Sequence, residues 1–246
     1  MSLGNLILFG LVNFVATTLS GISGGGGFIV TPVLIFLGLT PQQAIASGKL
    51  AAVALSLGSL QKLHKAKLHN WRVVAPIMIL AAVIGLAAPY FIVRLENDFY
   101  EKILGILLIV MIPVLYLTKS GQAKKELPQS FKTVGWVLIA VLLATSAIFS
   151  GGAGSLVTVA MMMFLGMSAL EANVTRRFSQ LALNALVFLG VIGSGLMVWD
   201  VAVVGAISAF FGGQLGSHLA LKKGDRFVLT FFAIFMFISG LVLLLG

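Results

Sequence analysis

The sequence predicts an all-α polytopic membrane protein made of two inverted-topology repeats, each a re-entrant helical hairpin followed by three transmembrane helices. Composition, an internal duplication and the distribution of basic residues predict this architecture. Of the 246 residues, 59% are hydrophobic and 9% are charged, whereas an average soluble domain carries about 25% charged residues. The mean hydropathy of +1.11 and the chain length fit a bundle of about seven to ten membrane segments. We expect no sizeable domain outside the membrane.

Ten apolar stretches follow one another, separated by polar or glycine-rich breaks. They cover residues 2–20, 28–39, 42–61, 71–93, 99–118, 132–149, 155–167, 169–191, 198–221 and 227–245. The stretches 28–39 and 155–167 are too short to span, because about 12 residues make roughly 18 Å of helix against a hydrocarbon core of roughly 30 Å. Each follows a glycine cluster, at residues 23–27 or 150–154. We therefore expect each short stretch to form the returning arm of a hairpin.

The glycine clusters come twice because the chain repeats itself. Residues 23–31 align with residues 150–158 at an offset of 127, and after one insertion the offset becomes 128, which pairs Trp71 with Trp199. The predicted parts are a first repeat over 1–118 (hairpin 1–39, spans 42–61, 71–93 and 99–118), a cytoplasmic linker over 119–130, and a second repeat over 131–246 (hairpin 132–167, spans 169–191, 198–221 and 227–245). Internal symmetry of this kind indicates two structural repeats.

The basic residues predict that the two halves are inverted in the membrane. Cytoplasmic loops collect Lys and Arg, so the loop around Lys65, the linker and the turn 222–226 are placed inside, and the net acidic turn 94–102 is placed outside. Residue 40 is then outside and residue 168 inside, which requires an odd number of crossings between them. Three full spans and one re-entrant hairpin meet this requirement. Both termini are predicted to lie outside the cytoplasm.

The charge and cysteine content exclude several classes of protein. An excess of 16 Lys and Arg over 7 Asp and Glu would indicate nucleic-acid binding in a soluble protein. Here the cations lie beside apolar spans, so we expect a lipid bilayer around the protein and no nucleic-acid partner. The chain has no cysteine, which excludes disulfides and cysteine-ligated metals. No nucleophile motif, phosphate-binding loop or metal-ligand cluster is present, so the sequence predicts neither an enzyme nor a bound cofactor or metal.

The two glycine clusters predict a binding site at membrane depth. Irregular backbone is tolerated there only where protein or a water-filled cavity surrounds it, because each unsatisfied amide in lipid costs several kcal/mol. Each cluster opens a short helix, whose free N–H groups and positive dipole end could face an anion. Glycine permits the close approach that such a contact needs. Close packing of small residues between helices is the alternative explanation.

Cations inside the spans are the second sign of a site. Lys49 lies roughly 13 Å into the helix expected after Thr40, and Arg177 lies as far past Ser168. The two cations align in the repeat. Charges at mid-depth are costly unless they meet anions or water. Lys49 could instead extend its aliphatic stem to the outer surface, and Arg176 and Arg177 could lie closer to the inner surface.

Polar side chains near these elements complete the candidate site. The candidate substrate-binding residues are Ser23, Gly24, Gly25, Gly26, Gly27, Thr31, Ser47, Lys49, Ser150, Gly151, Gly152, Gly154, Thr158, Thr175, Arg176 and Arg177. Weaker candidates are Asn13, Ser56, Gln180, Asn184 and Gln214. Hydroxyl groups in membrane helices commonly bond to their own backbone, so none is diagnostic alone. Glu171 and His218 are candidates for proton coupling, although an ion pair of Glu171 with Arg176 or Arg177 is the simpler interpretation.

The residues around the first glycine cluster resemble a known family. Residues 21–32, GISGGGGFIVTP, are followed by LGLTPQQA at 37–44 and by Ser47, Gly48 and Lys49, with a diverged copy in the second half. This pattern resembles the sulfite exporter TauE/SafE family, or 4-toluene sulfonate uptake permease family, over essentially the whole chain. The resemblance implies a secondary transporter of sulfite, sulfonates such as sulfoacetate and related organosulfur anions. It also implies a place in the cytoplasmic (inner) membrane of a bacterium or archaeon.

These observations together predict a mechanism. A small sulfur-containing anion binds between the two hairpin tips, where backbone amides contact its oxygens and Lys49 with Arg177 or Arg176 neutralises its charge. Inverted halves would expose this site to each side in turn. An inside-negative potential favours exit of an anion by about 2.3 kcal/mol per charge per 100 mV, so export is the expected direction. Proton-coupled uptake of the same anions and an anion channel are the alternatives.

Overall fold

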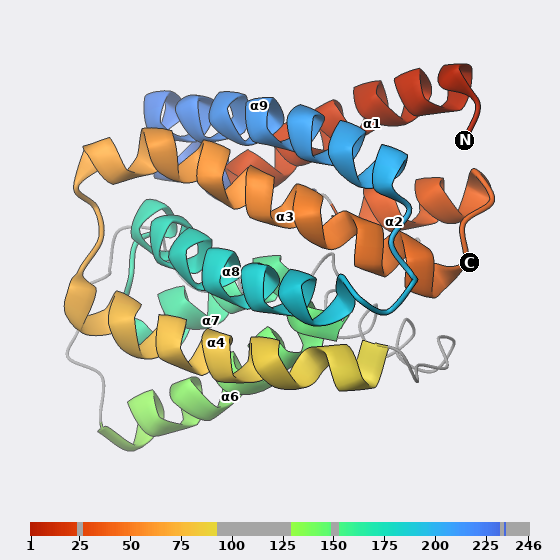
Figure 1. Cartoon of the computed structure of the whole chain (residues 1–246). Coiled ribbons are helices and arrows are strands. Elements are labelled where there is room, and N and C mark those ends of the chain that lie inside the picture. The colour runs from red at the N-terminus through yellow and green to blue at the C-terminus, as the bar shows by residue number, and fades with distance from the viewer. Residues whose placement is uncertain (24–26, 93–128, 149–152, 232–233, 235–246) are drawn as a thin grey trace.

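The computed structural model describes residues 1–23, 27–92, 129–148, 153–231 and 234. These residues form helices and connecting turns, and no strand occurs among them. The helices are α1 (Leu3–Ser23), α2 (Gly27–Phe36), α3 (Pro41–Leu63), the 3-10 turn η1 (His64–Ala66), α4 (Trp71–Ile92), α6 (Gln129–Ile148), α7 (Ala153–Leu165), α8 (Ala169–Val191) and α9 (Trp199–Lys223) (Figure 1). The all-α prediction is therefore confirmed for the described part of the chain.

Several helices are long and apolar enough to cross a membrane. Within the described residues these are α1, α3 with η1, α4, most of α6, and α9. α2 and α7 have 10 and 13 residues and are too short to span. The long helices expose large apolar side chains on their outer faces, as expected for contact with lipid. Examples are Leu11 on α1 and Leu86 on α4. The predicted span 99–118 and most of the span 227–245 lie outside the described residues.

The short helices return toward the end of the molecule at which the preceding helix began. In Figure 1, α1 begins and α2 ends at one end of the molecule, and α3 runs from there to the opposite end. α6 begins and α7 ends at that opposite end, and α8 runs back in the direction opposed to α3 (Figure 1). The breaks between the arms fall on residues 24–26 and 149–152, which the structure does not describe. Inversion of the halves in the membrane, and the extracytoplasmic placement of both termini, stay predictions.

α3 and α8 begin in the same way because their sequences carry the same start signal. Thr40 accepts from the Gln43 N–H while the Gln43 side chain accepts from the Thr40 N–H. Ser168 and Glu171 repeat this capping box at the start of α8. A capping box satisfies two backbone donors that have no partner within the helix. Each helix then continues for 23 residues.

Glycines set how closely the long helices pack, and two of the close contacts correspond in the sequence repeat. A Cβ at Gly85 on α4 would lie 2.7 Å from the carbonyl oxygen of Leu183 on α8. A Cβ at Gly213 on α9 would lie 2.5 Å from the carbonyl oxygen of Leu55 on α3. Gly85 and Gly213 are 128 positions apart, and so are Leu55 and Leu183. The α4–α8 and α9–α3 contacts are therefore equivalent, and each joins one half of the sequence to the other.

Candidate functional site

A polar cavity lies among the two short helices, α1, α3, α6 and α8. Its volume is about 70 Å³, and it is partly open. Its polar lining consists of Asn13, Thr17, Ser20, Thr31, Ser56, Ser146, Arg176, Arg177, Gln180 and Asn184. Gly154 at the start of α7 and Thr31 near the start of α2 bring both short helices to the cavity. The positive dipole end of α7 thus lies at its wall, whereas α2 lines it with Val30 and Thr31, the fourth and fifth residues of that helix.

The charge of the cavity comes from two neighbouring arginines of α8. Arg176 and Arg177 are 2% and 1% exposed. Arg176 donates through Nη2 to Asn173 Oδ1 at 2.8 Å, and Arg177 donates through Nη2 to the carbonyl oxygen of Ser20. Among the described residues neither arginine has a carboxylate partner, and the Nε of each is buried without a hydrogen-bond partner. Two buried guanidinium groups without a carboxylate partner among the described residues therefore place uncompensated positive charge at this part of the cavity wall.

Amide side chains extend the polar wall along α8. Gln180 donates to Ser146 Oγ on α6 at 3.1 Å, and Asn184 donates to Gln180 Oε1 at 2.9 Å. Arg176, Gln180 and Asn184 are spaced four residues apart and therefore share one face of the helix. This network connects α8 to the end of the first arm of the second hairpin.

Asn13 forms the opposite part of the wall on α1. Its Nδ2 donates to the carbonyl oxygen of Gly205 at 2.9 Å and to Ser208 Oγ at 2.7 Å on α9. A backbone carbonyl only accepts hydrogen bonds, so the Nδ2 must face α9. Its Oδ1 is buried without a partner among the described residues. Asn13 therefore has a buried acceptor oxygen without a hydrogen-bond partner among the described residues.

Lys49 is buried but does not line the cavity. Its side chain is 0% exposed and its Nζ donates to the carbonyl oxygen of Ala147 on α6 at 2.6 Å. The interpretation in which Lys49 reaches the outer surface is therefore wrong. Both arginines are buried and line the cavity. Their burial does not support the alternative that places the pair close to the inner surface.

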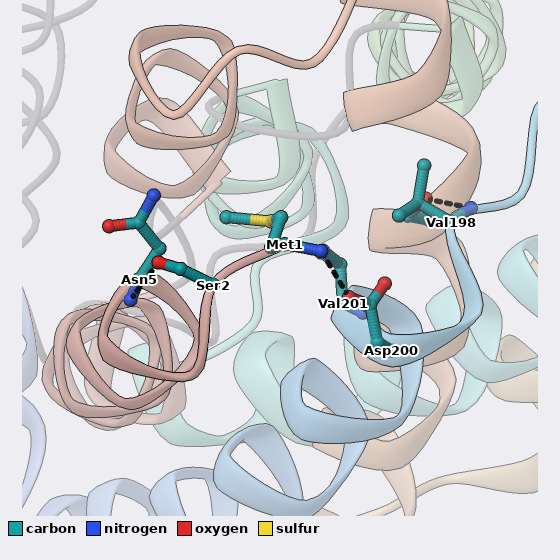
Figure 2. Close-up of polar contacts among 7 residues, drawn as sticks. Met1, Ser2, Asn5, Val198, Asp200 and Val201 are labelled. Atoms are coloured by element: carbon teal, nitrogen blue, oxygen red, sulfur yellow. Dashed lines mark hydrogen bonds and ion pairs between the residues drawn. The ribbon is translucent and has the colours of Figure 1, made fainter.

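Several other predicted site residues lie outside the cavity wall. Ser47 Oγ accepts from the Val198 N–H at 3.0 Å at the start of α9. At the same helix start the Met1 ammonium contacts Asp200 at 2.9 Å (Figure 2). Ser23 and Thr158 donate to carbonyl oxygens of their own helices. Thr175 is buried, and its hydroxyl has no partner within the described part of the chain. Gly27 begins α2.

Part of the predicted hairpin tips lies outside the described residues. These positions are Gly24, Gly25, Gly26, Ser150, Gly151 and Gly152. Of the two candidates for proton coupling, Glu171 accepts from the Ser168 N–H at 2.8 Å in the capping box, and His218 is exposed on α9. No ion pair of Glu171 with either arginine occurs in the described part of the chain. Neither residue lines the cavity.

The cavity contains polar residues that the main candidate set omitted. They are Asn13, Thr17, Ser20, Ser56, Ser146, Gln180 and Asn184. The four-residue spacing of Arg176, Gln180 and Asn184 is a signal that could have raised the two amides to the same standing as the arginine. Ser20 and Ser146 carry no comparable signal, because hydroxyl groups near helix ends are common.

Membrane-spanning helices that enclose a polar cavity at the ends of two short helices define a membrane transporter. The chain belongs to the sulfite exporter TauE/SafE family, whose model matches residues 9–243. The chain is similar to a "Probable membrane transporter protein" of Haemophilus influenzae, with 27% identity over 90% of this chain and 87% of the relative. It is 24% identical to "Probable membrane transporter protein ORF9" of Sinorhizobium sp, over 87% of this chain and 83% of the relative. It is 23% identical to "Probable membrane transporter protein YfcA" of Escherichia coli K12, over 90% of this chain and 84% of the relative. No solved structure matches the chain.

Proposed function

We propose that the protein is a secondary transporter that exports a small sulfur-containing anion, such as sulfite or a sulfonate, across the cytoplasmic membrane. The observation that carries the proposal is the pair of buried guanidinium groups at the cavity. A buried guanidinium charge on Arg176 or Arg177 without a carboxylate partner has a high free-energy cost in a membrane unless an anion or water compensates it. A tetrahedral oxyanion has enough oxygen acceptors for the free Nε groups, the amide of Gln180 and the first N–H groups of a short helix.

The sulfur chemistry rests on the family, and the anionic charge rests on the cavity. The family description names sulfite. Planar guanidinium groups bind oxyanions through several N–H donors at once, and sulfite and sulfonates share this set of oxygen acceptors. We therefore assign the anionic end of the substrate to the arginine side of the cavity, beside Ser20 and Gly154.

The proposed mechanism is alternating access around this cavity. Two observations support inverted repeats: α3 and α8 run in opposite directions (Figure 1), and the contacts of Gly85 and Gly213 are equivalent between the halves. An arrangement of this kind can open to one side and, with the roles of the halves exchanged, to the other. Export of an anion then needs no coupled ion at an inside-negative potential, which contributes about 2.3 kcal/mol per charge per 100 mV.

Flux through purified protein in proteoliposomes tests the function. Sulfite, thiosulfate, sulfoacetate, taurine and sulfate are offered with membrane potential and pH gradient set independently. We expect saturable flux of one or more sulfur anions that follows the potential and does not depend on the pH gradient. Dependence on the pH gradient would replace export by proton-coupled uptake, and conductance that does not saturate would replace the carrier by a channel. No flux of any of these compounds would contradict the proposal.

A further inference from the structure

We propose that Lys49 and Arg177 are a matched pair of positioning residues, each of which caps the C-terminal end of the first hairpin helix of the other half. Lys49 then acts on the conformational step of transport and does not bind the substrate. The inference rests on the proposed transport function but makes a separate claim about these side chains. We call the contacts of Lys49 with Ala147 and of Arg177 with Ser20 the cross-half caps.

The first cap lies at the end of α6. The last four carbonyl groups of a helix have no intrahelical partner and carry the negative end of the helix dipole. Ile148 is the last described residue of α6, so the carbonyl of Ala147 lies in the last described turn of this helix. Lys49 Nζ lies 2.6 Å from that oxygen, and its side chain is fully buried. A buried ammonium at this place satisfies a carbonyl and offsets the dipole together.

The second cap lies at the end of α1. This helix ends at Ser23, and the carbonyl of Ser20 accepts from Arg177. Asn173 Nδ2 donates to the next two carbonyls, at 3.4 Å to Gly21 and 3.0 Å to Ile22. Residues of α8 therefore contact three carbonyl groups in the last described turn of α1.

The two caps correspond at both of their ends. Lys49 and Arg177 are 128 positions apart, and Ser20 and Ala147 are 127 positions apart. The region of the glycine clusters aligns at an offset of 127, and the spans after it align at 128, as the single insertion requires. A repeat that preserves both the cation and the carbonyl has preserved the contact itself, although the side chain changed from lysine to arginine.

The partners of the caps suit a contact that must break and form again. Neither cation has a carboxylate partner among the described residues, so each contact joins a charge to a backbone dipole. The free-energy cost of opening such a charge–dipole contact is smaller than the cost of opening a buried ion pair. Because each cap joins the two halves, neither hairpin can move against the opposite long helix without opening one cap. We infer that the caps control the rate of the conformational change.

The difference between Arg177 and Lys49 decides which residue tests the idea. Arg177 lines the cavity as well as capping α1, so its removal would change binding and positioning together. Lys49 is absent from the cavity wall. Lys49→Met keeps the length of the side chain and removes the charge, and Lys49→Arg places at this position the residue that the repeat uses in the second half.

The experiment measures KM and maximum flux of the transported sulfur anion in proteoliposomes for the full chain. We expect Lys49→Met to lower maximum flux at least about tenfold with KM changed less than about twofold, because a cap lost from a helix end alters the conformational step and leaves the cavity intact. We expect Lys49→Arg to restore flux to within about threefold of the unmodified protein. Lys62→Met, which removes an exposed lysine from the same helix, is the matched control and should leave both quantities unchanged.

Several results would overturn the inference. A KM raised tenfold by Lys49→Met at unchanged maximum flux would make Lys49 a substrate ligand. If Lys49→Met fails to fold, Lys49→Arg is judged alone, and a folded Lys49→Arg with a tenfold higher KM has the same meaning. If the unmodified protein transports none of the anions, the proposed function fails and the caps are tested by the melting temperature in detergent. Lys49→Met should then melt several degrees lower and Lys49→Arg should not, and equal melting temperatures for all three proteins would contradict the caps.

Discussion

α3 and α8 are equivalent helices of the sequence repeat, yet they present different chemistry to the cavity. Both have 23 residues and both begin with a capping box. On the cavity face, Arg176, Gln180 and Asn184 of α8 stand where α3 has small residues, namely Gly48, Ala52 and Ser56. The first hairpin arms show the reverse, because Asn13 and Thr17 of α1 correspond to Ala140 and Ala144 of α6.

The comparison separates what the duplication kept from what it changed. The start signals, the close glycine contacts and the cross-half caps occur in both halves, and these features position the backbone. Most of the polar side chains of the cavity wall come from α1 of one half and α8 of the other, whereas α2, α3 and α6 each supply one hydroxyl group. The frame is therefore close to symmetric, whereas the groups proposed to contact the substrate are not.

Arg177→Met should have the largest effect, because it removes a cation from the cavity and a cap from α1 together. Loss of charge-assisted hydrogen bonds at about 1.5–3 kcal/mol each predicts a fall in flux per unit of substrate by roughly 10–150-fold from the cavity alone. The loss of the cap adds to this. Flux in proteoliposomes measures it, with Lys222→Met as the control for an exposed cation. An Arg177→Met protein that retains the KM of the unmodified chain would remove Arg177 from the binding site.

Gly213→Leu and Gly85→Leu should both be strongly destabilising changes outside the cavity. Each inserts a side chain where a Cβ alone would already crowd a carbonyl of the facing helix, and overpacking of this kind costs about 1–3 kcal/mol. Both variants should melt at lower temperature in detergent, and by similar amounts. Gly193→Ala is the control, because nothing lies within 4 Å of a Cβ there. A large difference between the two variants would show that the equivalent contacts are not equally important.

Gln180→Ala gives α8 the residue that α3 has at the equivalent position. We expect the KM to rise about tenfold, in line with one hydrogen bond of about 1–1.5 kcal/mol. Ser56→Ala removes a polar group from the α3 side of the cavity for comparison. It should raise the KM less than about threefold, because Ser56 Oγ already donates to the Ala52 carbonyl oxygen at 2.9 Å. Equal effects of the two substitutions would contradict the asymmetry of the cavity wall.

Thr40→Ala and Ser168→Ala each remove the N-cap side chain of a long helix. Loss of such a cap costs about 1 kcal/mol, so both variants should melt slightly below the unmodified protein, and the double variant should show roughly the sum of the two shifts. The melting temperature in detergent measures the effect. A single variant that melts as low as the double variant would mean that one capping box depends on the other.

Glu171→Gln should have the smallest effect. Gln43 occupies the equivalent position and forms the same contact with its N-cap residue, so an amide should replace the carboxylate with less than about twofold change in flux. The measurement is flux with and without a pH gradient. Loss of a gradient-dependent component in this variant alone would restore Glu171 as a proton-coupling residue.

The sequence predicted the helices better than the site. Long apolar stretches, the Thr40 and Ser168 start signals and the two short stretches indicated helices close to their observed bounds, because hydropathy and capping are local properties. The interior position of Lys49 and Arg177 was also predictable from their place within apolar spans, and both residues are buried. The partner of Lys49 was not, because a backbone carbonyl gives no signal in a sequence and any residue could supply it.

The polar wall was harder to predict for a related reason. A cavity is the space between elements that are distant in the chain, and Asn13 is brought to it by packing that no local pattern encodes. Thr31 and Gly154 were predicted because the glycine clusters mark the ends of the short helices. Ser47 was assigned to the substrate on its position next to Lys49, but its hydroxyl contacts the Val198 N–H instead.

The reciprocal capping has a consequence for the two halves as separate polypeptides. Each half supplies the cation that the other half's hairpin helix requires, so neither contains the cap for its own helix end. A half produced alone would carry a buried charge without a carbonyl and a helix end without a cation. Two copies of one half in opposite orientations could supply each other, which is the arrangement expected of an ancestor that worked as an antiparallel dimer before its gene was duplicated and fused.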